Sequence, residues 1–311
     1  MALPRSWSFW DEGSRGPFGR GWRCNVTKLF PDVPADRFLP GHPLRRCRGF
    51  IFDVDGVLCR GEDPIPRAPE AIERLRRGGK KVIFISNNST KSRKDYIAKF
   101  ERLGIPVTEE DLVLSTYATA WYVALEQPGA KVYMVGASGL RAELEGAGLE
   151  LVEDPFQAEY VVVGSPFDST GRVREDNAHR ITGALRALYH AGAKFVATNP
   201  DRIFPAKDGV IPGTGAVIGA LSYMLDREPD AIIGKPSKYI VEIALSRLGI
   251  PPGDCAIVGD MDTDMLAGER AGMVRVFVRS GAMTEEKLRS LGIEPDFAFD
   301  SVIDMLTWEG G

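Results

Sequence analysis

The stretch Phe50-Ile51-Phe52-Asp53-Val54-Asp55-Gly56-Val57-Leu58 sets two carboxylates two residues apart within an apolar run. The run from Phe50 to Leu58 is typical of a buried strand, and Gly56 allows the chain to turn. At a strand end, one carboxylate can attack phosphorus or hold a metal ion, and the other can transfer a proton. The stretch therefore predicts a strand that carries reactive groups.

The residues that follow predict a βαβ unit. We expect a helix over 68–77, because Pro69 fits a first helical turn and Gly78-Gly79 ends the pattern, and a strand over 81–85. This order of elements indicates an α/β fold with a parallel sheet. Further strands are expected over 131–135, 160–163, 194–198, 231–233, 256–259 and 274–278, and further helices over 91–103, 140–147, 177–190 and 237–248.

Composition limits the possible partners. The chain has 311 residues, 44% of them hydrophobic and 26% charged, which suits a globular protein of about two domains. The formal net charge of −4 argues against nucleic acid or an anionic membrane as the main partner. Four scattered cysteines suit a reducing compartment, and no apolar run is long enough to span a bilayer. We expect a cytoplasmic location.

Residues 1–47 differ from the rest of the chain. They are rich in Gly, Pro and Trp, and they carry eight basic residues against four acidic ones. They contain no apolar segment of the kind found in secretory signals. We interpret this segment as an extension packed on the surface of the core, with a basic docking arm as the alternative.

Four polar clusters each follow a predicted strand. They are Asp53-Val54-Asp55-Gly56, Ser86-Asn87-Asn88-Ser89, Gly234-Lys235-Pro236 and Gly259-Asp260-Met261-Asp262-Thr263-Asp264. Each cluster alone is more typical of a turn than of a site. In open α/β sheets, however, ligands bind at the carboxyl ends of the strands, so the four clusters are expected to converge. Grouped carboxylates favour a bound cation, and oxygen ligands suit Mg²⁺, whereas Lys235, Ser86 and a helix N-terminus suit a phosphate.

Other short motifs are excluded by single residues. The acidic run from Asp260 resembles the start of a calcium-binding loop, but Met265 stands where that loop needs glycine. A P-loop needs Ser or Thr after its lysine, and Pro236 follows Lys235. The three histidines are too scattered for a histidine phosphatase or a zinc site.

Taken in this order, the four clusters resemble those of the haloacid dehalogenase superfamily of phosphatases. Ser86-Asn87-Asn88-Ser89, Gly234-Lys235-Pro236-Ser237, Ala197-Thr198-Asn199-Pro200-Asp201 and Pro212-Gly213-Thr214-Gly215 are similar to one branch, subfamily IIA, the NagD and p-nitrophenyl phosphatase-like group. The resemblance extends from about residue 48 to the end. It implies a Rossmann-like core with a parallel sheet and an inserted α/β cap domain of the C2a type.

The resemblance also implies roles for individual residues. Asp53 is expected to be the nucleophile that forms an aspartyl phosphate, and Asp55 the group that gives and takes the proton. Mg²⁺ is expected to be held by Asp53, the main-chain carbonyl of Asp55, and Asp260, with Asp264 or Asp262 as the supporting acid. Ser86, Asn87 (through its backbone), Asn88 and Lys235 are expected to bind the phosphoryl group, and Asn199 to face the substrate. In the last cluster three residues separate Asp260 from Asp264, whereas relatives in this branch usually have four, so the supporting acid stays open.

The distance between the second and third clusters predicts the cap. Residues 86 and 235 are much further apart than one βα unit requires, which leaves room for a domain. We expect a core of residues 48–126 and 229–311 and a cap of residues 127–228. A cap is expected to exclude bulky substrates, which favours a small phosphorylated metabolite, and caps of this type often form dimer contacts in relatives, so a homodimer is expected.

The sequence thus predicts a Mg²⁺-dependent phosphatase acting on small phosphate monoesters. Two alternatives stay open: a phosphotransferase or mutase on the same scaffold, and a regulatory protein that binds a ligand without catalysis. The sequence does not identify the substrate.

Overall fold

The computed structural model describes residues 42–177, 179–206 and 209–307. Most of the predicted N-terminal extension lies outside these residues. Within the described part, Leu44 and Cys47 are fully buried in the same hydrophobic cluster as Phe50 and Phe52. The core therefore begins before residue 48, because apolar side chains just upstream of the first strand pack beneath it.

The larger sheet has six parallel strands in the order β15-β14-β13-β1-β4-β5. From β1 the chain moves outward in one direction through β4 and β5 and in the other through β13, β14 and β15. The direction in which successive strands are added to the sheet thus reverses next to β1. Ligands bind at such a point in folds of this class. The strands are β1 (Gly49–Asp53), β4 (Lys81–Ser86), β5 (Leu112–Leu114), β13 (Cys255–Gly259), β14 (Val274–Val278) and β15 (Phe297–Phe299).

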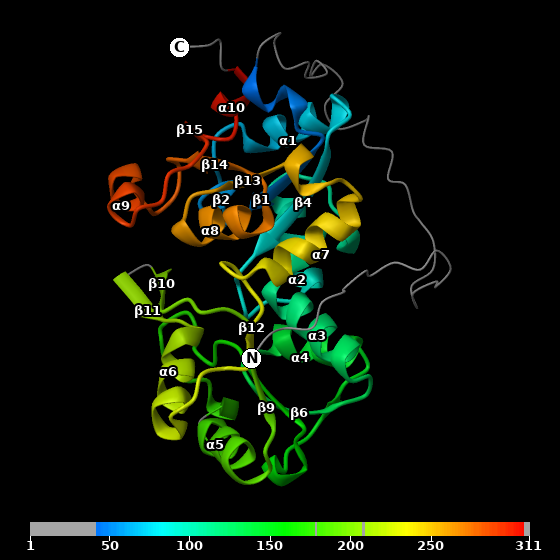
Figure 1. Cartoon of the computed structure of the whole chain (residues 1–311), viewed down its shortest axis with the longest axis vertical. Helices are drawn as coiled ribbons and strands as arrows, with labels where there is room; N and C mark the ends of the chain where they lie inside the picture. The colour runs from blue at the N-terminus through cyan, green and yellow to red at the C-terminus, as the bar shows by residue number, and fades with distance from the viewer. Residues whose placement is uncertain (1–41, 178, 207–208, 308–311) are drawn as a thin grey trace. The chain divides into compact units, whose positions relative to one another are not determined.

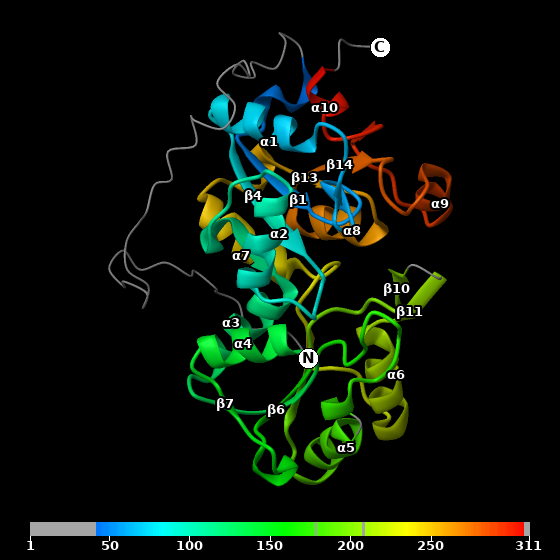
Figure 2. The same ribbon diagram turned by 180° about the vertical axis from the view of Figure 1, so that it is seen from behind.

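Helices cover both faces of this sheet, as Figures 1 and 2 show from opposite sides. Side chains alternate along each strand, so Phe50, Phe52 and Phe84 pack toward α1 and α2, whereas Ile51 and Ile83 pack toward α7 and α8. Burial on both faces explains why the strands are apolar throughout. The helices are α1 (Ala68–Arg77), α2 (Arg93–Arg102), α3 (Ser115–Glu126), α7 (Lys238–Leu248), α8 (Asp262–Ala271), α9 (Glu285–Ser290) and α10 (Asp304–Thr307).

The insert between β5 and α7 forms a second parallel sheet of five strands, in the order β12-β9-β8-β6-β7. Its elements are β6 (Lys131–Val135), α4 (Ser138–Gly146), β7 (Glu150–Leu151), β8 (Tyr160–Val163), α5 (Arg180–His190), β9 (Lys194–Ala197), α6 (Thr214–Leu225) and β12 (Ala231–Ile232). An antiparallel hairpin, β10 (Ile203–Ala206) and β11 (Gly209–Pro212), leads into α6. The α/β fold class and the inserted α/β unit are as predicted.

Two predicted boundaries were wrong. The strand predicted over 50–58 ends at Asp53, because Gly56 takes a left-handed φ of 89° and the chain folds back into a small hairpin, β2 (Cys59–Arg60) and β3 (Asp63–Pro64). The predicted return to the core at residue 229 comes too early, because β12 pairs with β9 of the smaller sheet. A short apolar run does not reveal which sheet it joins.

Candidate active site

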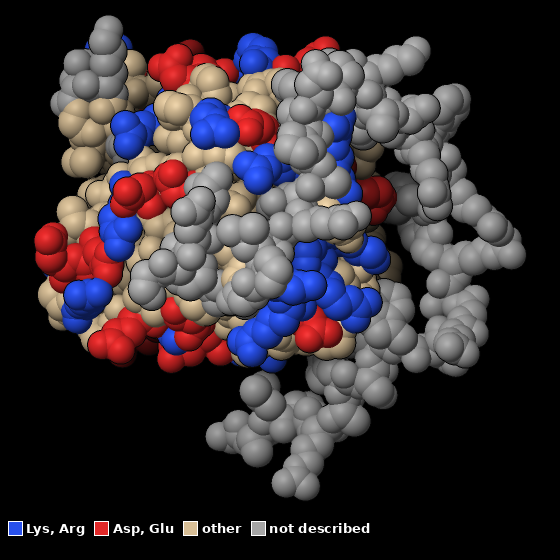
Figure 3. All heavy atoms as spheres, turned by 90° about the horizontal axis from the view of Figure 1, so that it is seen from above, with Lys and Arg blue, Asp and Glu red and all other residues tan. Residues whose placement is uncertain are grey.

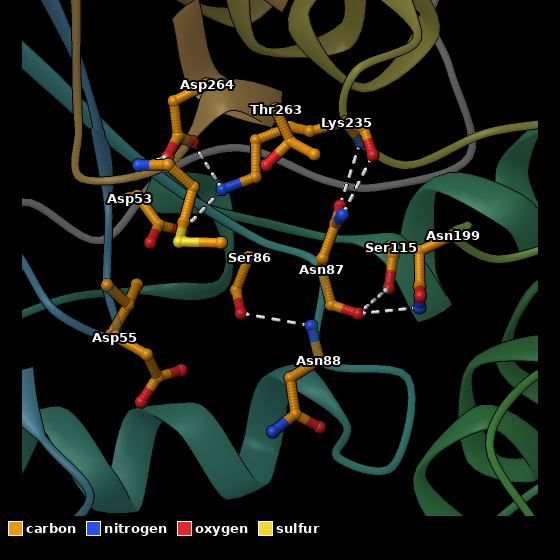
Figure 4. Close-up of polar contacts among 12 residues, drawn as sticks. Asp53, Asp55, Ser86, Asn87, Asn88, Ser115, Asn199, Lys235, Thr263 and Asp264 are labelled. Atoms are coloured by element: carbon orange, nitrogen blue, oxygen red, sulfur yellow. Dashed lines mark hydrogen bonds and ion pairs between the residues drawn. The ribbon is translucent and has the colours of Figure 1, made fainter. Parts of the chain in front are cut away.

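The carboxyl ends of three adjacent strands bring the predicted groups together. Asp53 is the last residue of β1, Ser86 is the last residue of β4, and Asp260 directly follows β13. Because β1 lies between β13 and β4, these ends form one edge of the sheet. Lys235 joins them from the segment that follows β12. Figure 4 shows Asp53, Asp264 and Lys235 pointing toward one another, with Ser86 beside them.

Lys235 is the cation at the centre of this group. Its Nζ lies 2.6 Å from Asp53 Oδ1 and 2.6 Å from Asp264 Oδ1, and all three side chains are buried. Burial alone would lower the pKa of Lys235, but the Asp264 and Asp53 carboxylates raise it above its ordinary value, so the ammonium stays charged. Burial raises the pKa of Asp53 well above its ordinary range, with Lys235 opposing that shift and Asp264 and Asp260 adding to it.

Asp264, rather than Asp262, lies in this cluster. Helix α8 begins at Asp262, and Asp264 Oδ2 turns back to accept a hydrogen bond of 3.1 Å from the backbone N–H of Met261. Its other carboxylate oxygen pairs with Lys235. Asp262 is only partly buried, and its Oδ1 accepts a local hydrogen bond from the N–H of Thr263. The short spacing of the last motif therefore still brings a second acid into the site, by way of the first turn of the helix.

The carboxylates of Asp53, Asp260 and Asp264 fit a divalent cation. They each offer an oxygen, and these oxygens lie within 4.8 Å of one another. Asp260 Oδ1 is buried and has no hydrogen-bond partner among the described residues, whereas Oδ2 accepts one from the N–H of Ala282. Burial and the neighbouring Asp264 raise the pKa of Asp260 to about 7. An unpaired buried oxygen among carboxylates is suited to Mg²⁺, which prefers oxygen ligands.

The backbone at Gly56 approaches Asp260 so closely that a side chain has no room. A Cβ added to Gly56 would collide with the Asp260 carboxylate, and the φ of 89° already favours glycine. We expect Gly56→Ala to destabilise the protein by about 1–3 kcal/mol and to reduce turnover, because it strains the backbone and displaces Asp260. Urea unfolding and initial rates measure both effects.

Gly61→Ala is the matched control for this prediction. Gly61 lies in the small hairpin that follows Gly56 and has a φ of 63°, but a Cβ there would meet no atom of the described residues within 4 Å. Gly61→Ala should therefore cost stability only through the strain of a left-handed φ, and this variant should keep its turnover. Equal losses of turnover in the two variants would contradict the importance of the contact with Asp260.

Asp55 lies outside the carboxylate cluster. Its side chain is 46% exposed, and Lys99 Nζ donates a 2.8 Å hydrogen bond to its Oδ1. Tyr96 donates a longer hydrogen bond of 3.4 Å to its Oδ2. Figure 4 shows the Asp55 carboxylate turned away from Asp53, toward the helix that carries these two residues. The two carboxylates of the first motif are therefore directed to different neighbours.

Ser86 and Asn88 form the turn after β4. Ser86 Oγ accepts a 3.1 Å hydrogen bond from the N–H of Asn88 and lies 2.8 Å from the hydroxyl of Tyr96. The side-chain oxygen of Asn88 accepts hydrogen bonds from the N–H and the hydroxyl of Thr90. Asn88 thus shapes the turn through its side chain, while the Ser86 hydroxyl contacts Tyr96 and the backbone of Asn88.

Asn87 braces Lys235 through its side-chain amide. Asn87 Oδ1 accepts from the N–H of Lys235 at 2.8 Å, and Nδ2 donates to the Lys235 carbonyl at 2.9 Å and to Asp201 Oδ1 at 3.1 Å. The Asn87 carbonyl accepts from Asn199 Nδ2 at 2.8 Å and from Ser115 Oγ at 3.0 Å, as Figure 4 shows. Both asparagine side chains therefore have protein partners, and Asn199 is fully buried.

Sequence reasoning missed several residues of this site. Tyr96, Lys99 and Ser115 were not predicted, nor was the loop after β14, from which Ala282 contacts Asp260. The loop could have been found from its place at the carboxyl end of the next strand in the sheet. Tyr96 and Lys99 carry a weaker signal: they lie three residues apart on the helix that follows the second motif.

Comparison with known proteins identifies relatives over most of the chain. A family model described as haloacid dehalogenase-like hydrolase matches residues 50–150, and one described as HAD-hydrolase-like matches residues 232–305. The chain is 33% identical over 257 residues to an acid sugar phosphatase of Staphylococcus haemolyticus. This match covers 82% of this chain and 94% of that protein. It is 36% identical over 283 residues to the chloroplastic phosphoglycolate phosphatase 1A of Arabidopsis thaliana, covering 83% and 76%.

A solved structure agrees with these relatives. The p-nitrophenyl phosphatase from Archaeoglobus fulgidus superimposes with a TM-score of 0.78 at 45% sequence identity, covering 84% of this chain and 98% of that one. The chain belongs to the haloacid dehalogenase superfamily and, within it, to the branch of the NagD proteins and p-nitrophenyl phosphatases.

Proposed function

We propose that this phosphatase hydrolyses small phosphate monoesters with the help of Mg²⁺, through an aspartyl-phosphate intermediate on Asp53. The observation that carries the proposal is the buried group of Asp53, Lys235 and Asp264 at a strand end, beside an Asp260 oxygen without a hydrogen-bond partner in the described part of the chain. A buried carboxylate beside a lysine is a suitable nucleophile toward phosphorus, because the lysine can neutralise the incoming phosphoryl charge.

In the proposed reaction, an Asp53 oxygen attacks phosphorus and the bond from phosphorus to the ester oxygen breaks. Asp55 gives its proton to that oxygen, and the alcohol leaves. A water molecule then attacks the phosphorus of the aspartyl phosphate, its proton passes to Asp55, and the bond between phosphorus and Asp53 breaks. The products are the alcohol, inorganic phosphate and regenerated enzyme.

The remaining residues bind and orient. Lys235, the Ser86 hydroxyl and the backbone N–H of Asn87 are proposed to hold the oxygens of the transferring group, while Asn87 and Asn199 keep Lys235 and the turn in place. Asp53, Asp260 and the main-chain carbonyl of Asp55 are proposed to hold Mg²⁺, with Asp264 as the supporting acid. When bound, Mg²⁺ supplies positive charge that offsets the negative charge of the phosphoryl group and the carboxylates.

Small substrates are proposed because of the insert and the relatives. Residues of the insert contact the core at the site itself: Thr214 Oγ1 lies 3.1 Å from Ser89 Oγ, and Asp201 accepts from Asn87. Relatives carry the names acid sugar phosphatase and phosphoglycolate phosphatase, and both names refer to small metabolites. We propose that the substrate of this chain belongs to the same size class.

Other partners stay predictions. On the face in Figure 3, basic and acidic side chains are interspersed among the coloured atoms, which favours a small ligand over nucleic acid. Among the described residues, the helices are too short or too polar to cross a membrane. The homodimer and the cytoplasmic location stay predictions from the sequence.

A panel of small phosphate esters tests the proposal. We expect Mg²⁺-dependent release of phosphate from p-nitrophenyl phosphate and from at least one sugar phosphate, phosphoglycolate or glycerol phosphate. Rapid quenching should trap a phosphoenzyme labelled at Asp53. If no ester in the panel releases phosphate in a Mg²⁺-dependent way, the proposal is wrong. Transfer of phosphate to added alcohols in place of water would identify a phosphotransferase instead.

Mg²⁺ is expected to raise the melting temperature more at pH 8 than at pH 5. In the metal-free protein the pKa of Asp260 is raised from 3.8 to about 7, so the folded state binds this proton more tightly than the unfolded state does. The stability of the metal-free protein should therefore fall as the pH rises from about 4 to about 7. Mg²⁺ must displace the proton below pH 7 but binds the free carboxylate above it.

Thermal melts with and without Mg²⁺ across this pH range measure the effect. Asp260→Asn is the control, because it removes both the titrating group and a proposed ligand, and its melting temperature should respond little to Mg²⁺. A Mg²⁺ effect of the same size at pH 5 and pH 8 in the unmodified protein would be evidence against metal binding by this cluster.

A further inference from the structure

One face of helix α2 contacts two residues of the candidate active site, Asp55 and Ser86. Tyr96 and Lys99 lie three residues apart, so their side chains share a face of the helix. Lys99 contacts Asp55, and Tyr96 contacts both Asp55 and Ser86. The Asp55 carboxylate is therefore linked to Ser86 through a single hydroxyl group.

The ion pair between Lys99 and Asp55 is sheltered on the lysine side. The Lys99 side chain is 12% exposed, whereas that of Asp55 is 46% exposed, and the two atoms lie 2.8 Å apart. Burial lowers the pKa of Lys99, but the Asp55 carboxylate outweighs this and raises it, so the lysine is charged. A half-exposed carboxylate without such a partner would sample several rotamers. Lys99 thus restricts Asp55 to one position.

Tyr96 adds a second, weaker restraint. Its side chain is buried, and its hydroxyl lies 2.8 Å from Ser86 Oγ and 3.4 Å from Asp55 Oδ2. Burial and the nearby Asp55 raise the pKa of Tyr96 well above its ordinary value, so the hydroxyl keeps the proton that it donates. Because Ser86 is proposed to bind the phosphoryl group, this link sets the distance between that group and Asp55.

We propose that Lys99, assisted by Tyr96, is a positioning residue that holds the Asp55 carboxylate where it can pass a proton to the leaving oxygen. The proposal rests on the function proposed above. It concerns how Asp55 is held in place and assigns neither α2 residue a direct contact with the substrate. The test therefore uses the dependence of the rate on the leaving group, which a general loss of structure does not change.

The central experiment compares Lys99→Met with the unmodified enzyme on an alkyl phosphate, glycerol phosphate, and on p-nitrophenyl phosphate. An alkoxide is a poor leaving group and needs the proton, whereas p-nitrophenolate leaves without one. The ratio kcat/KM reports the steps up to the departure of the leaving group. We expect kcat/KM for glycerol phosphate to fall about 10- to 100-fold and that for p-nitrophenyl phosphate to fall much less, since general acid catalysis contributes about 10²- to 10⁴-fold.

Three further variants complete the design. Lys94→Met is the matched control, because Lys94 lies on the same helix and is exposed, and both rates should be unchanged. Lys99→Arg should retain most of the activity on glycerol phosphate, since it keeps the charge. Tyr96→Phe should show the same selective loss to a smaller degree, and it decides the question if Lys99→Met does not fold.

Equal losses on the two substrates would overturn the proposal, as would the absence of any loss. A faster rate on glycerol phosphate would overturn it too, because Lys99 would then be suppressing the acid rather than placing it. An unmodified enzyme without Mg²⁺-dependent activity on either ester would instead overturn the proposed function itself, so the two failures are distinguishable.

Discussion

Asp53→Asn is expected to reduce kcat by at least about a thousand-fold while leaving the fold intact. An amide is a very poor nucleophile toward phosphorus. Removing the nucleophile of a catalytic group of residues typically lowers kcat by at least this factor. The change keeps the volume of the side chain and removes a desolvated negative charge. Because burial raises the pKa of Asp53, its charge is costly in the folded state, so the variant should not be much less stable.

Initial rates on p-nitrophenyl phosphate and a thermal melt measure these two outcomes. Asp262→Asn is the matched control, since Asp262 lies at the start of α8 but outside the carboxylate cluster, and it should retain most of the activity. An Asp53→Asn variant with unchanged turnover would disprove the nucleophile assignment. A large loss of turnover in Asp262→Asn would indicate that Asp262, rather than Asp264, is the supporting acid.

Lys235→Met is expected to destabilise the metal-free protein by about 3–5 kcal/mol, besides lowering kcat/KM. The substitution leaves Asp53 and Asp264 buried without their shared cation, and removing one partner of a buried ion pair costs about that much. Mg²⁺ should recover part of the lost stability, because it supplies positive charge to the same carboxylates. Lowering the pH should also recover part of it, since protonation neutralises the unpaired acids.

Urea unfolding with and without Mg²⁺ measures the cost. Lys238→Met provides the control: Lys238 opens α7 with 57% of its side chain exposed and pairs with Glu242 at 3.0 Å. Such an exposed pair contributes no more than about 0.5 kcal/mol. If the Lys235 variant unfolds at the same urea concentration as the unmodified protein in the absence of metal, the buried ion pair does not have the role assigned to it.

The sequence predicted the elements whose ends carry strong local signals. The helix predicted over 68–77 matches α1, because Pro69 and Gly78-Gly79 define its two ends. The strand at residue 50 was extended too far, since Val57 and Leu58 are apolar for a different reason: they are buried in the core beyond the turn. The hydrophobic pattern of a segment does not show where its strand ends when the residues after the turn are also buried.

The site followed from topology more than from local pattern. Asp53, Ser86 and Asp260 come together because their strands are neighbours, and that follows from the βαβ rules once the strands are recognised. The partners of Asp55 did not follow. Its contact with Lys99 depends on the direction in which two side chains point across 44 residues of sequence, and no local rule gives that direction.

The hydrogen bonds of Asn87 have a consequence for protein engineering. Its amide joins the turn after β4 to Lys235, and its carbonyl and amide also hold Asn199 and Asp201, which belong to the insert. A chimera that receives its insert from a relative would have to keep matching residues at 199 and 201, because these residues bind Asn87, whose amide in turn holds the Lys235 backbone. Exchange of the insert in this enzyme would therefore also exchange two of the residues that hold Asn87 in place.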